Sequence, residues 1–211
     1  MKKSVLITLG LLSFTGASFA GPIDKAPPPR PILPPVPSSS GGWYGGLNGG
    51  YLWLNDANGC GCTTLNASSG WGVLGVVGYH FSDGISLGLS SGYMGGKYDI
   101  LHEGSQIDGT ADLHMVPITA NASYTFNLTD SLLLYVGGGL GTAWSELNGV
   151  GDHENKGDWH FAWQARAGFG YKVSDDVSLN LGYRYIHVAD ALGEFGDAKG
   201  HMAEAGIKFN F

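Results

Sequence analysis

The chain has 211 residues, of which only 14% are charged, well below the roughly 25% of an ordinary soluble domain. Residues 41–211 contain seven Lys and Arg residues against 17 carboxylates, which gives this part a net charge of −10. This acidic balance argues against nucleic acid or an anionic membrane surface as a partner, because both would repel the chain.

The first 20 residues have the pattern of a secretory signal peptide. Lys2 and Lys3 precede an apolar run over residues 5–14, and Ser-Phe-Ala at 18–20 supplies the small-x-small cleavage pattern. A transmembrane anchor is the weaker interpretation, because the run is shorter than the roughly 20 residues that span a bilayer. We therefore expect residues 1–20 to be cleaved and the mature chain to be exported.

Residues 21–40 contain most of the nine prolines in the chain. Such a run favours extended, polyproline-like backbone and cannot build a packed core. We expect a periplasmic linker, and a docking motif for a periplasmic partner is the alternative.

From residue 41 onward, apolar residues recur at every second position, which is the period of a β-strand. The clearest case is one face of segment 115–126, formed by Val116, Ile118, Ala120, Ala122, Tyr124 and Phe126. The pattern predicts eight strands, near 42–55, 69–81, 85–99, 111–126, 131–146, 158–172, 177–188 and 200–211. Aromatic residues gather towards the ends of these segments, as they do at membrane interfaces.

The connections between the expected strands alternate in length. Tight turns are expected at 82–84, 127–130 and 174–176, and longer polar loops near 56–68, 100–110, 147–157 and 189–199. In hydrocarbon every backbone N–H and C=O must be paired internally, and only helices and closed barrels achieve this. The sequence therefore predicts an all-β fold, an eight-stranded antiparallel transmembrane up-and-down β-barrel over 41–211, with short periplasmic turns and longer surface loops. A soluble β-sandwich would share the alternation but not the aromatic ends or the sparse charge.

Three stretches resemble a known family: Gly-Trp-Tyr-Gly-Gly-Leu-Asn-Gly-Gly-Tyr at 42–51, Leu-Gly-Tyr-Arg-Tyr at 181–185 and Ala-Gly-Ile-Lys-Phe-Asn-Phe at 205–211. They are similar to the opacity-family or OmpA-like small outer-membrane β-barrel proteins, also called the porin family, of Gram-negative bacteria. The resemblance implies residence in the outer membrane, in contact with its lipid and lipopolysaccharide. It also implies that Phe209 and Phe211 belong to a terminal signal read by the barrel-assembly machinery.

Four charged residues should point into the barrel on the same alternation: Arg166, Arg184, Glu204 and Lys208. A charge inside a narrow barrel has to be paired, because desolvating it alone is prohibitive. We expect a lumen charge cluster that fixes strand register, while a permeation or gating site is the alternative. Inward-facing Gly137, Gly139 and Gly141, with Gly88 and Gly92, could leave room for water.

An enzymatic role is not expected. The segment Arg184-x-x-His187-x-Ala189-Asp190 loosely resembles the Arg-x-x-His-x-Ser-Asn segment of outer-membrane lipid A deacylases, but Ala189 stands where that family has its serine nucleophile. A methyl group cannot attack an ester, so deacylation would need Ser178 or another hydroxyl to be brought close.

No cofactor is expected, and histidines with the spacing of a metal motif are absent from the sequence. Haemin or metal binding through His102, His153, His160, His187 or His201 is a minor alternative to their being polar loop residues. Cys60 and Cys62 form a lone Cys-Gly-Cys in an expected surface loop, where an oxidising environment favours a disulfide but the ring would be tight.

Two functions follow from these patterns. The favoured one is a structural and surface-interaction protein whose loops contribute to envelope integrity, adhesion or host contact through a surface ligand. The alternative is a narrow porin-like channel for small solutes.

Overall fold

A computed structural model describes residues 41–58, 63–102, 105–149, 157–192 and 196–211. The expected signal peptide (1–20), the expected linker (21–40) and the cysteine pair Cys60 and Cys62 lie outside these ranges. No helix within the described ranges has both the length and the hydropathy to cross a bilayer.

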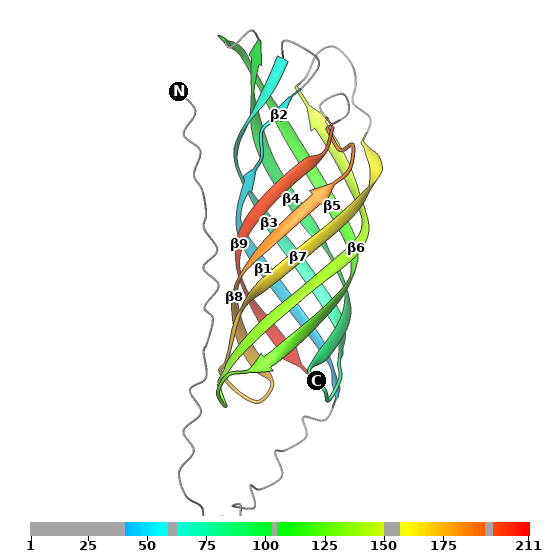
Figure 1. The fold of residues 1–211 in the computed structure, drawn as a ribbon, viewed down its shortest axis with the longest axis vertical. Helices are drawn as coiled ribbons and strands as arrows, with labels where there is room; N and C mark the ends of the chain where they lie inside the picture. The colour runs from blue at the N-terminus through cyan, green and yellow to red at the C-terminus, as the bar shows by residue number, and fades with distance from the viewer. Residues whose placement is uncertain (1–40, 59–62, 103–104, 150–156, 193–195) are drawn as a thin grey trace, which may run out of the picture. The chain divides into compact units, whose positions relative to one another are not determined.

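The described chain is built from antiparallel strands. They are β1 (Gly42–Leu54), β2 (Ala57–Asn58), β3 (Thr63–His80), β4 (Ile85–His102), β5 (Ser105–Asn127), β6 (Leu132–Asn148), β7 (Asp158–Lys172), β8 (Val177–Val188) and β9 (Ala198–Asn210). The eight long strands pair in chain order and close where β1 pairs with both β3 and β9 (Figure 1). The two-residue β2 adds only a short ladder to β3. The predicted eight-stranded antiparallel barrel is confirmed.

The closing seam joins the first strand to the last. Tyr44 pairs with Asn210 at one end of the seam and Leu54 with Gly200 at the other. Beyond the last ladder residue, the Phe211 N–H still donates to the Trp43 carbonyl at 2.9 Å. The barrel therefore has no free strand edge along this seam, as an apolar solvent requires.

Three tight turns lie at the same end of the barrel as the C-terminus, here called the turn end (Figure 1). The Phe81 N–H donates to the Ile85 carbonyl at 2.7 Å, and equivalent bonds close the turns after Asn127 and Lys172. Gly84 has φ +91°, a left-handed conformation that glycine adopts without strain. In bacterial outer-membrane barrels the end with the short turns and both termini faces the periplasm.

At the opposite end, here called the loop end, the strands extend further than the sequence pattern predicted. The expected loop 100–110 is mostly a hairpin of β4 and β5, whose backbone ladder continues to the pair His102 and Ser105. Most of the expected loop 56–68 is likewise taken up by β2 and the start of β3. With 23 residues, β5 is about twice as long as the 9–11 residues that cross a membrane. The alternation of apolar residues does not reveal these extensions, because strands outside the lipid need no apolar face and here carry polar residues.

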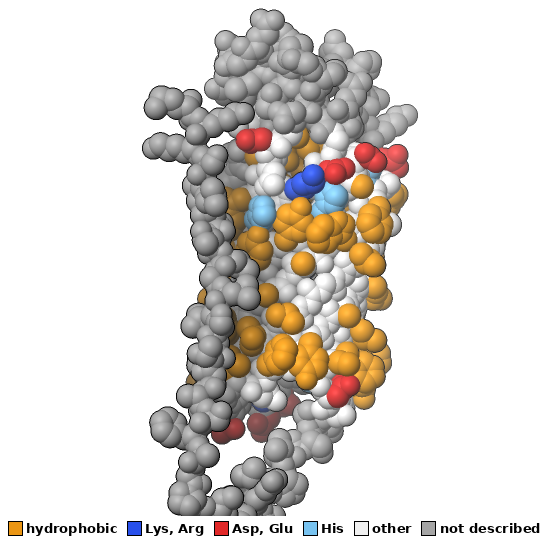
Figure 2. Space-filling model, in the orientation of Figure 1, with side chains coloured by type: hydrophobic (Ala, Val, Ile, Leu, Met, Phe, Trp, Pro, Cys, Tyr) orange, Lys and Arg blue, Asp and Glu red, His pale blue; other side chains and the backbone are white. Residues whose placement is uncertain are grey.

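The outer surface carries large exposed hydrophobic side chains in two bands, separated by a zone with fewer of them (Figure 2). The band at the turn end includes Trp43, Phe81, Phe126, Phe169 and Tyr171, and the band at the loop end includes Tyr51, Trp53, Trp71, Trp159 and Phe161. Aromatic girdles of this kind mark the two membrane–water interfaces of outer-membrane barrels.

Candidate functional site in the barrel lumen

The half of the lumen nearest the loop end is filled by tightly packed apolar side chains. This apolar plug contains Leu52, Leu54, Leu74, Met94, Tyr98, Leu113, Met115, Ile186, Val188, Leu192 and Met202, all buried. The inward positions here are apolar although they do not face lipid, so alternation between polar and apolar residues breaks down at the loop end.

Below the plug lies an ion pair between the inward faces of β8 and β9. The Arg184 guanidinium donates from Nε to Glu204 Oε2 at 2.8 Å and from Nη2 to Oε1 at 3.2 Å. Both side chains are almost fully buried, at 1% and 2% exposed. The two-point geometry supplies the pairing and hydrogen bonds that a buried charge requires.

The pair continues into a layer of polar side chains that crosses the lumen. Arg184 Nη1 donates to Gln164 Oε1, and Gln164 Nε2 donates to Thr119 Oγ1 at 2.7 Å. Asn121 Nδ2 then donates to Ser90 Oγ at 2.9 Å. We call Ser90, Thr119, Asn121, Gln164, Arg184 and Glu204 the polar layer; it links β4, β5, β7, β8 and β9.

Strand β6 contributes no side chain to this layer, because its inward residue there is Gly139. Gly139 pairs with Asn121 on one side and Gln164 on the other, and Gln164 Nε2 donates to Asn121 Oδ1 directly across it. A Cβ at Gly139 would lie 2.2 Å from Asn121 Oδ1. The expectation that this inward glycine leaves room for water is therefore wrong: it leaves room for a neighbouring side chain.

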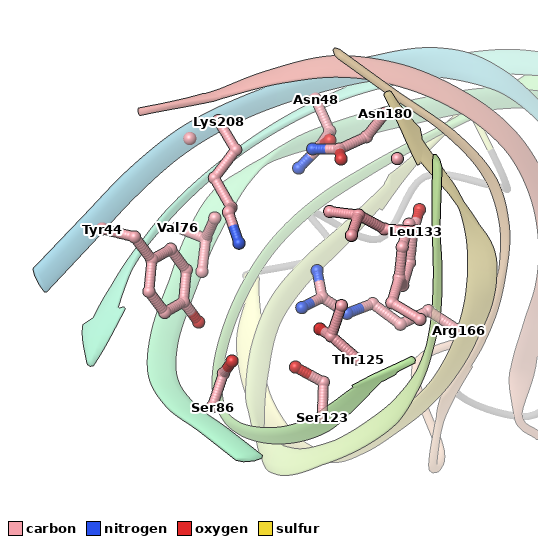
Figure 3. Close-up of a pocket in the computed structure, with 13 residues that line it drawn as sticks. Tyr44, Asn48, Val76, Ser86, Ser123, Thr125, Leu133, Arg166, Asn180 and Lys208 are labelled. Atoms are coloured by element: carbon pink, nitrogen blue, oxygen red, sulfur yellow. The ribbon is translucent and has the colours of Figure 1, made fainter. Parts of the chain in front are cut away.

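Nearer the turn end, the lumen opens into a cavity of about 50 Å³. Arg166 projects into it from β7 and Lys208 from β9, on either side of β8 (Figure 3). Arg166 lies over the Tyr135 ring, with Cζ 5.6 Å from its centroid, and Lys208 Nζ lies 5.1 Å from the Tyr44 centroid. The other polar lining residues are Asn48, Ser86, Ser123, Thr125 and Asn180.

The cavity leads towards the mouth of the barrel at the turn end. A wider vestibule of about 780 Å³ lies between the turns, and Thr125, Leu133 and Lys208 line both spaces. The vestibule is also lined by His80, Lys172, Asp83, Asp175 and Asp176. Among the described residues the lumen is thus accessible from the turn end and filled at the loop end.

The four charged residues expected to form one cluster are separated by the fold. The structure pairs Arg184 with Glu204 and leaves Arg166 and Lys208 in the cavity, without an ion pair to any described carboxylate. Alternation fixes which residues face inward but not their height along the barrel. The tilt of the strands decides which inward residues share a layer.

Several residues of the lumen were missed by the sequence argument. Ser90, Thr119 and Asn121 in the polar layer and Tyr135 in the cavity belong to no motif, and Tyr44 lies in the family-like stretch at 42–51 without a role there. The sequence does show that these residues occupy the inward-facing positions of strands whose opposite face is apolar, and this could have marked them as lumen residues.

The strand alternates within the deacylase-like segment, so that Arg184 faces the lumen while His187 lies on the outer face near the loop end. His187 Nδ1 accepts from Trp163 Nε1 at 2.6 Å, and His187 Nε2 lies 2.9 Å from Asp197 Oδ2. Ser178 is nine residues earlier on β8, about 30 Å away at the usual rise per residue. The structure therefore does not bring Ser178 to His187.

The remaining histidines do not gather into a metal site in the described ranges, where no group of three His, Cys, Asp or Glu residues could hold an ion. His201 lies in β9 with its ring 5.2 Å from that of Tyr185, and His160 lies in β7, within the strands expected over 200–211 and 158–172 and beside the loops. His153 falls outside the described residues.

Asp197 organises the connection between β8 and β9. Its Oδ1 accepts from the Asp190 N–H at 3.2 Å, and its Oδ2 lies 3.6 Å from Lys199 Nζ. The Asp190 N–H, followed by the nearby charges of Lys199 and His187, lowers the pKa of the Asp197 carboxyl. Asp190 itself has φ 51°, so this bond accompanies a left-handed turn residue.

Comparison with known proteins shows which family and which proteins this chain is similar to. The model of the outer membrane protein beta-barrel domain matches residues 9–211. The 25 kDa outer-membrane immunogenic protein of Brucella ovis is 27% identical, over 91% of this chain and 92% of the relative. The outer membrane protein PagN of Salmonella typhimurium is 26% identical over 63% of each chain.

Solved structures share the fold. Neisserial surface protein A superimposes with a TM-score of 0.55 and 18% identity, covering 80% of this chain and 97% of that one. OprG of Pseudomonas aeruginosa gives 0.51 and 18%, covering 82% and 98%. The chain therefore belongs to the outer membrane protein beta-barrel domain family and resides in the outer membrane of a Gram-negative bacterium.

Proposed function

We propose that the protein is a closed membrane anchor that presents its extracellular segments for contact with surfaces or ligands outside the cell. The apolar plug carries this proposal. Leu52, Met94 and Met202 are 0% exposed in the half of the lumen nearest the outside. Such packing is the interior of a folded core, whereas a channel needs a continuous hydrated path.

The polar layer supports the same function. Its side chains hydrogen-bond to one another across the lumen, so their polar groups are satisfied without a column of water. Eight strands enclose a space that side chains just fill, while open aqueous channels come with many more strands. A porin-like channel is the alternative function, and conductance measurements in planar bilayers distinguish it from a closed anchor.

The relatives support a role at the cell surface. The Brucella relatives are named as outer-membrane immunogenic proteins, and recognition by antibodies requires exposed segments. In this chain the described part of the β4–β5 hairpin, Gly149, residues 189–192 and residues 196–197 lie at the loop end.

We also propose that the outer face contacts lipopolysaccharide and that the barrel-assembly machinery inserts the chain. Lys97 and Lys199 lie near the loop end, with exposed fractions of 68% and 43%. Each ammonium group lies near one carboxylate, that of Asp112 or Asp197, and the exposed side chains can also reach the phosphates of lipopolysaccharide.

The test combines surface exposure with conductance. An epitope inserted next to Gly149 should be bound by antibody on intact cells, while one inserted next to Asp175 should be bound only after the outer membrane is permeabilised. The refolded protein should show no steady openings in planar bilayers. Reversed epitope accessibility would contradict the proposed orientation, and reproducible openings of constant size would favour the channel.

A further inference from the structure

The cavity near the turn end holds two cations without a described partner of opposite charge. Its lining contains Arg166 and Lys208 but no Asp or Glu. Glu204, the carboxylate on the same face of β9 as Lys208, is already held by Arg184 at 2.8 Å. Both side chains are half-buried, and a cation that is partly withdrawn from water without a counter-charge is unfavourable, so this arrangement differs from the satisfied layer above it.

One donor of the cavity also lacks a partner. Arg166 Nε is buried and has no hydrogen-bond partner among the described residues. The contacts of Arg166 and Lys208 with the Tyr135 and Tyr44 rings use the faces of those rings, which leaves the N–H groups free to donate.

Neutral donors complete the wall. Hydroxyls of Ser123 and Thr125 and amides of Asn48 and Asn180 surround the space between the two cations (Figure 3). Hydroxyl and amide groups can all donate to an oxygen placed between them. Two cations and several neutral donors that converge without a carboxylate form the complement of an anion.

We propose that this cavity is a binding site for a small oxyanion, either an inorganic phosphate or sulfate or the carboxylate of a small organic acid. At about 50 Å³ the space is that of about three to five water molecules, which suits such a group and excludes a large ligand. The anion enters from the periplasm through the vestibule, because the apolar plug fills the other side.

The experiment follows the Arg166 side chain in the full barrel refolded in detergent micelles. The ¹⁵Nε–H signal of Arg166 is recorded during separate titrations with sodium phosphate and sodium acetate, with ionic strength held constant by sodium chloride. A saturable shift is expected in the unmodified protein. Tighter binding of phosphate would identify an inorganic oxyanion, and tighter binding of acetate a carboxylate.

Matched lysine variants locate the site. Lys208→Gln should weaken binding at least tenfold, because it removes one of the two cations in the cavity. Lys97→Gln, on the outer face at the loop end, should change it less than twofold. If Arg166→Gln folds, it should lose the rise in thermal midpoint that the anion gives the unmodified barrel.

Two results would overturn the proposal. One is the absence of a saturable Arg166 shift with both anions. The other is an equal shift in the unmodified and Lys208→Gln proteins, since the signal would then report general ionic effects and not a built site.

Discussion

At the scale of single residues, the buried Arg184–Glu204 pair should dominate the stability of the lumen. Glu204→Gln keeps the size of the side chain but leaves the Arg184 charge without its counter-ion at 1% exposure. Breaking a buried pair in this way typically costs about 3–5 kcal/mol. We expect a clear fall in the urea concentration at which half of the refolded barrel is unfolded. Heat-modifiable gel mobility measures the unfolded fraction.

The exposed pair of Lys97 and Asp112 provides the control. Its atoms are 3.9 Å apart and its side chains are 68% and 45% exposed, so Asp112→Asn should change stability by less than about 1 kcal/mol. Equal effects of the two substitutions would show that the buried pair does not fix the barrel. Raised conductance with unchanged stability in Glu204→Gln would instead indicate a gate.

Asp197 gives a prediction about pH. Because the Asp190 N–H and the charges of Lys199 and His187 lower the pKa of this carboxyl, the ionised form stabilises the β8–β9 connection. That contribution is present above the ordinary value of 3.8 and is lost as pH falls through the lower folded value. Carboxyl ¹³C NMR should show Asp197 titrating below 3.8, together with the Asp190 amide signal.

Asp197→Asn should abolish the acid transition of the Asp190 amide while leaving the barrel folded. If that amide titrates identically in the variant, another group organises the connection.

At the scale of elements, Gly139 allows β7 and β5 to bond across β6. Gly139→Ala places a methyl group 2.2 Å from Asn121 Oδ1, which separates Asn121 from Gln164. Overpacking of this kind costs about 1–3 kcal/mol. The matched control is Gly49→Ala on the outer face of β1, where the added atom would meet its nearest neighbours at 3.7 and 3.8 Å. Equal unfolding midpoints for the two variants would contradict the role of Gly139.

At the end of the last strand, Phe211 is expected to matter for assembly of the barrel but little for its stability. The Phe211 side chain is 75% exposed and therefore adds little packing to the finished barrel. Phe211→Ser should leave the stability of the refolded protein within about 1 kcal/mol but reduce the amount inserted into the outer membrane of cells. Loss of stability in the refolded variant, with normal insertion, would show that Phe211 is a packing residue and not an assembly signal.

These elements also show what the sequence could predict. Strands inside the membrane were found because lipid demands an apolar face at every second residue, as in 115–126. The continuation of β4 and β5 beyond the membrane was missed, because outside lipid that demand ends. The partner of each inward charge was not predictable either. Lys208 and Glu204 share a face of β9 but lie four residues apart, in different layers, and the strand tilt decides which residues of the neighbouring strands share each layer.

At the scale of the whole molecule, the barrel is filled at the outer half of its lumen and accessible at the inner half. This asymmetry follows from residues on the inward face of every long strand, with apolar positions towards the loop end and polar or charged ones towards the turn end. It agrees with an anchor that presents segments outward, and it leaves the periplasmic cavity free for a separate role.

The apolar plug can be tested through Met94, which is 0% exposed at its centre. If the outer half of the lumen is a packed core, Met94→Ala leaves a cavity and destabilises the barrel by about 2–5 kcal/mol. Leu89→Ala on the same strand is the control, because Leu89 is 59% exposed towards the lipid and lipid can fill the space that the substitution leaves. Unfolding midpoints and bilayer conductance should be measured on both variants. A water-filled lumen would give the opposite pattern, with Met94→Ala stable and conducting more than the unmodified protein.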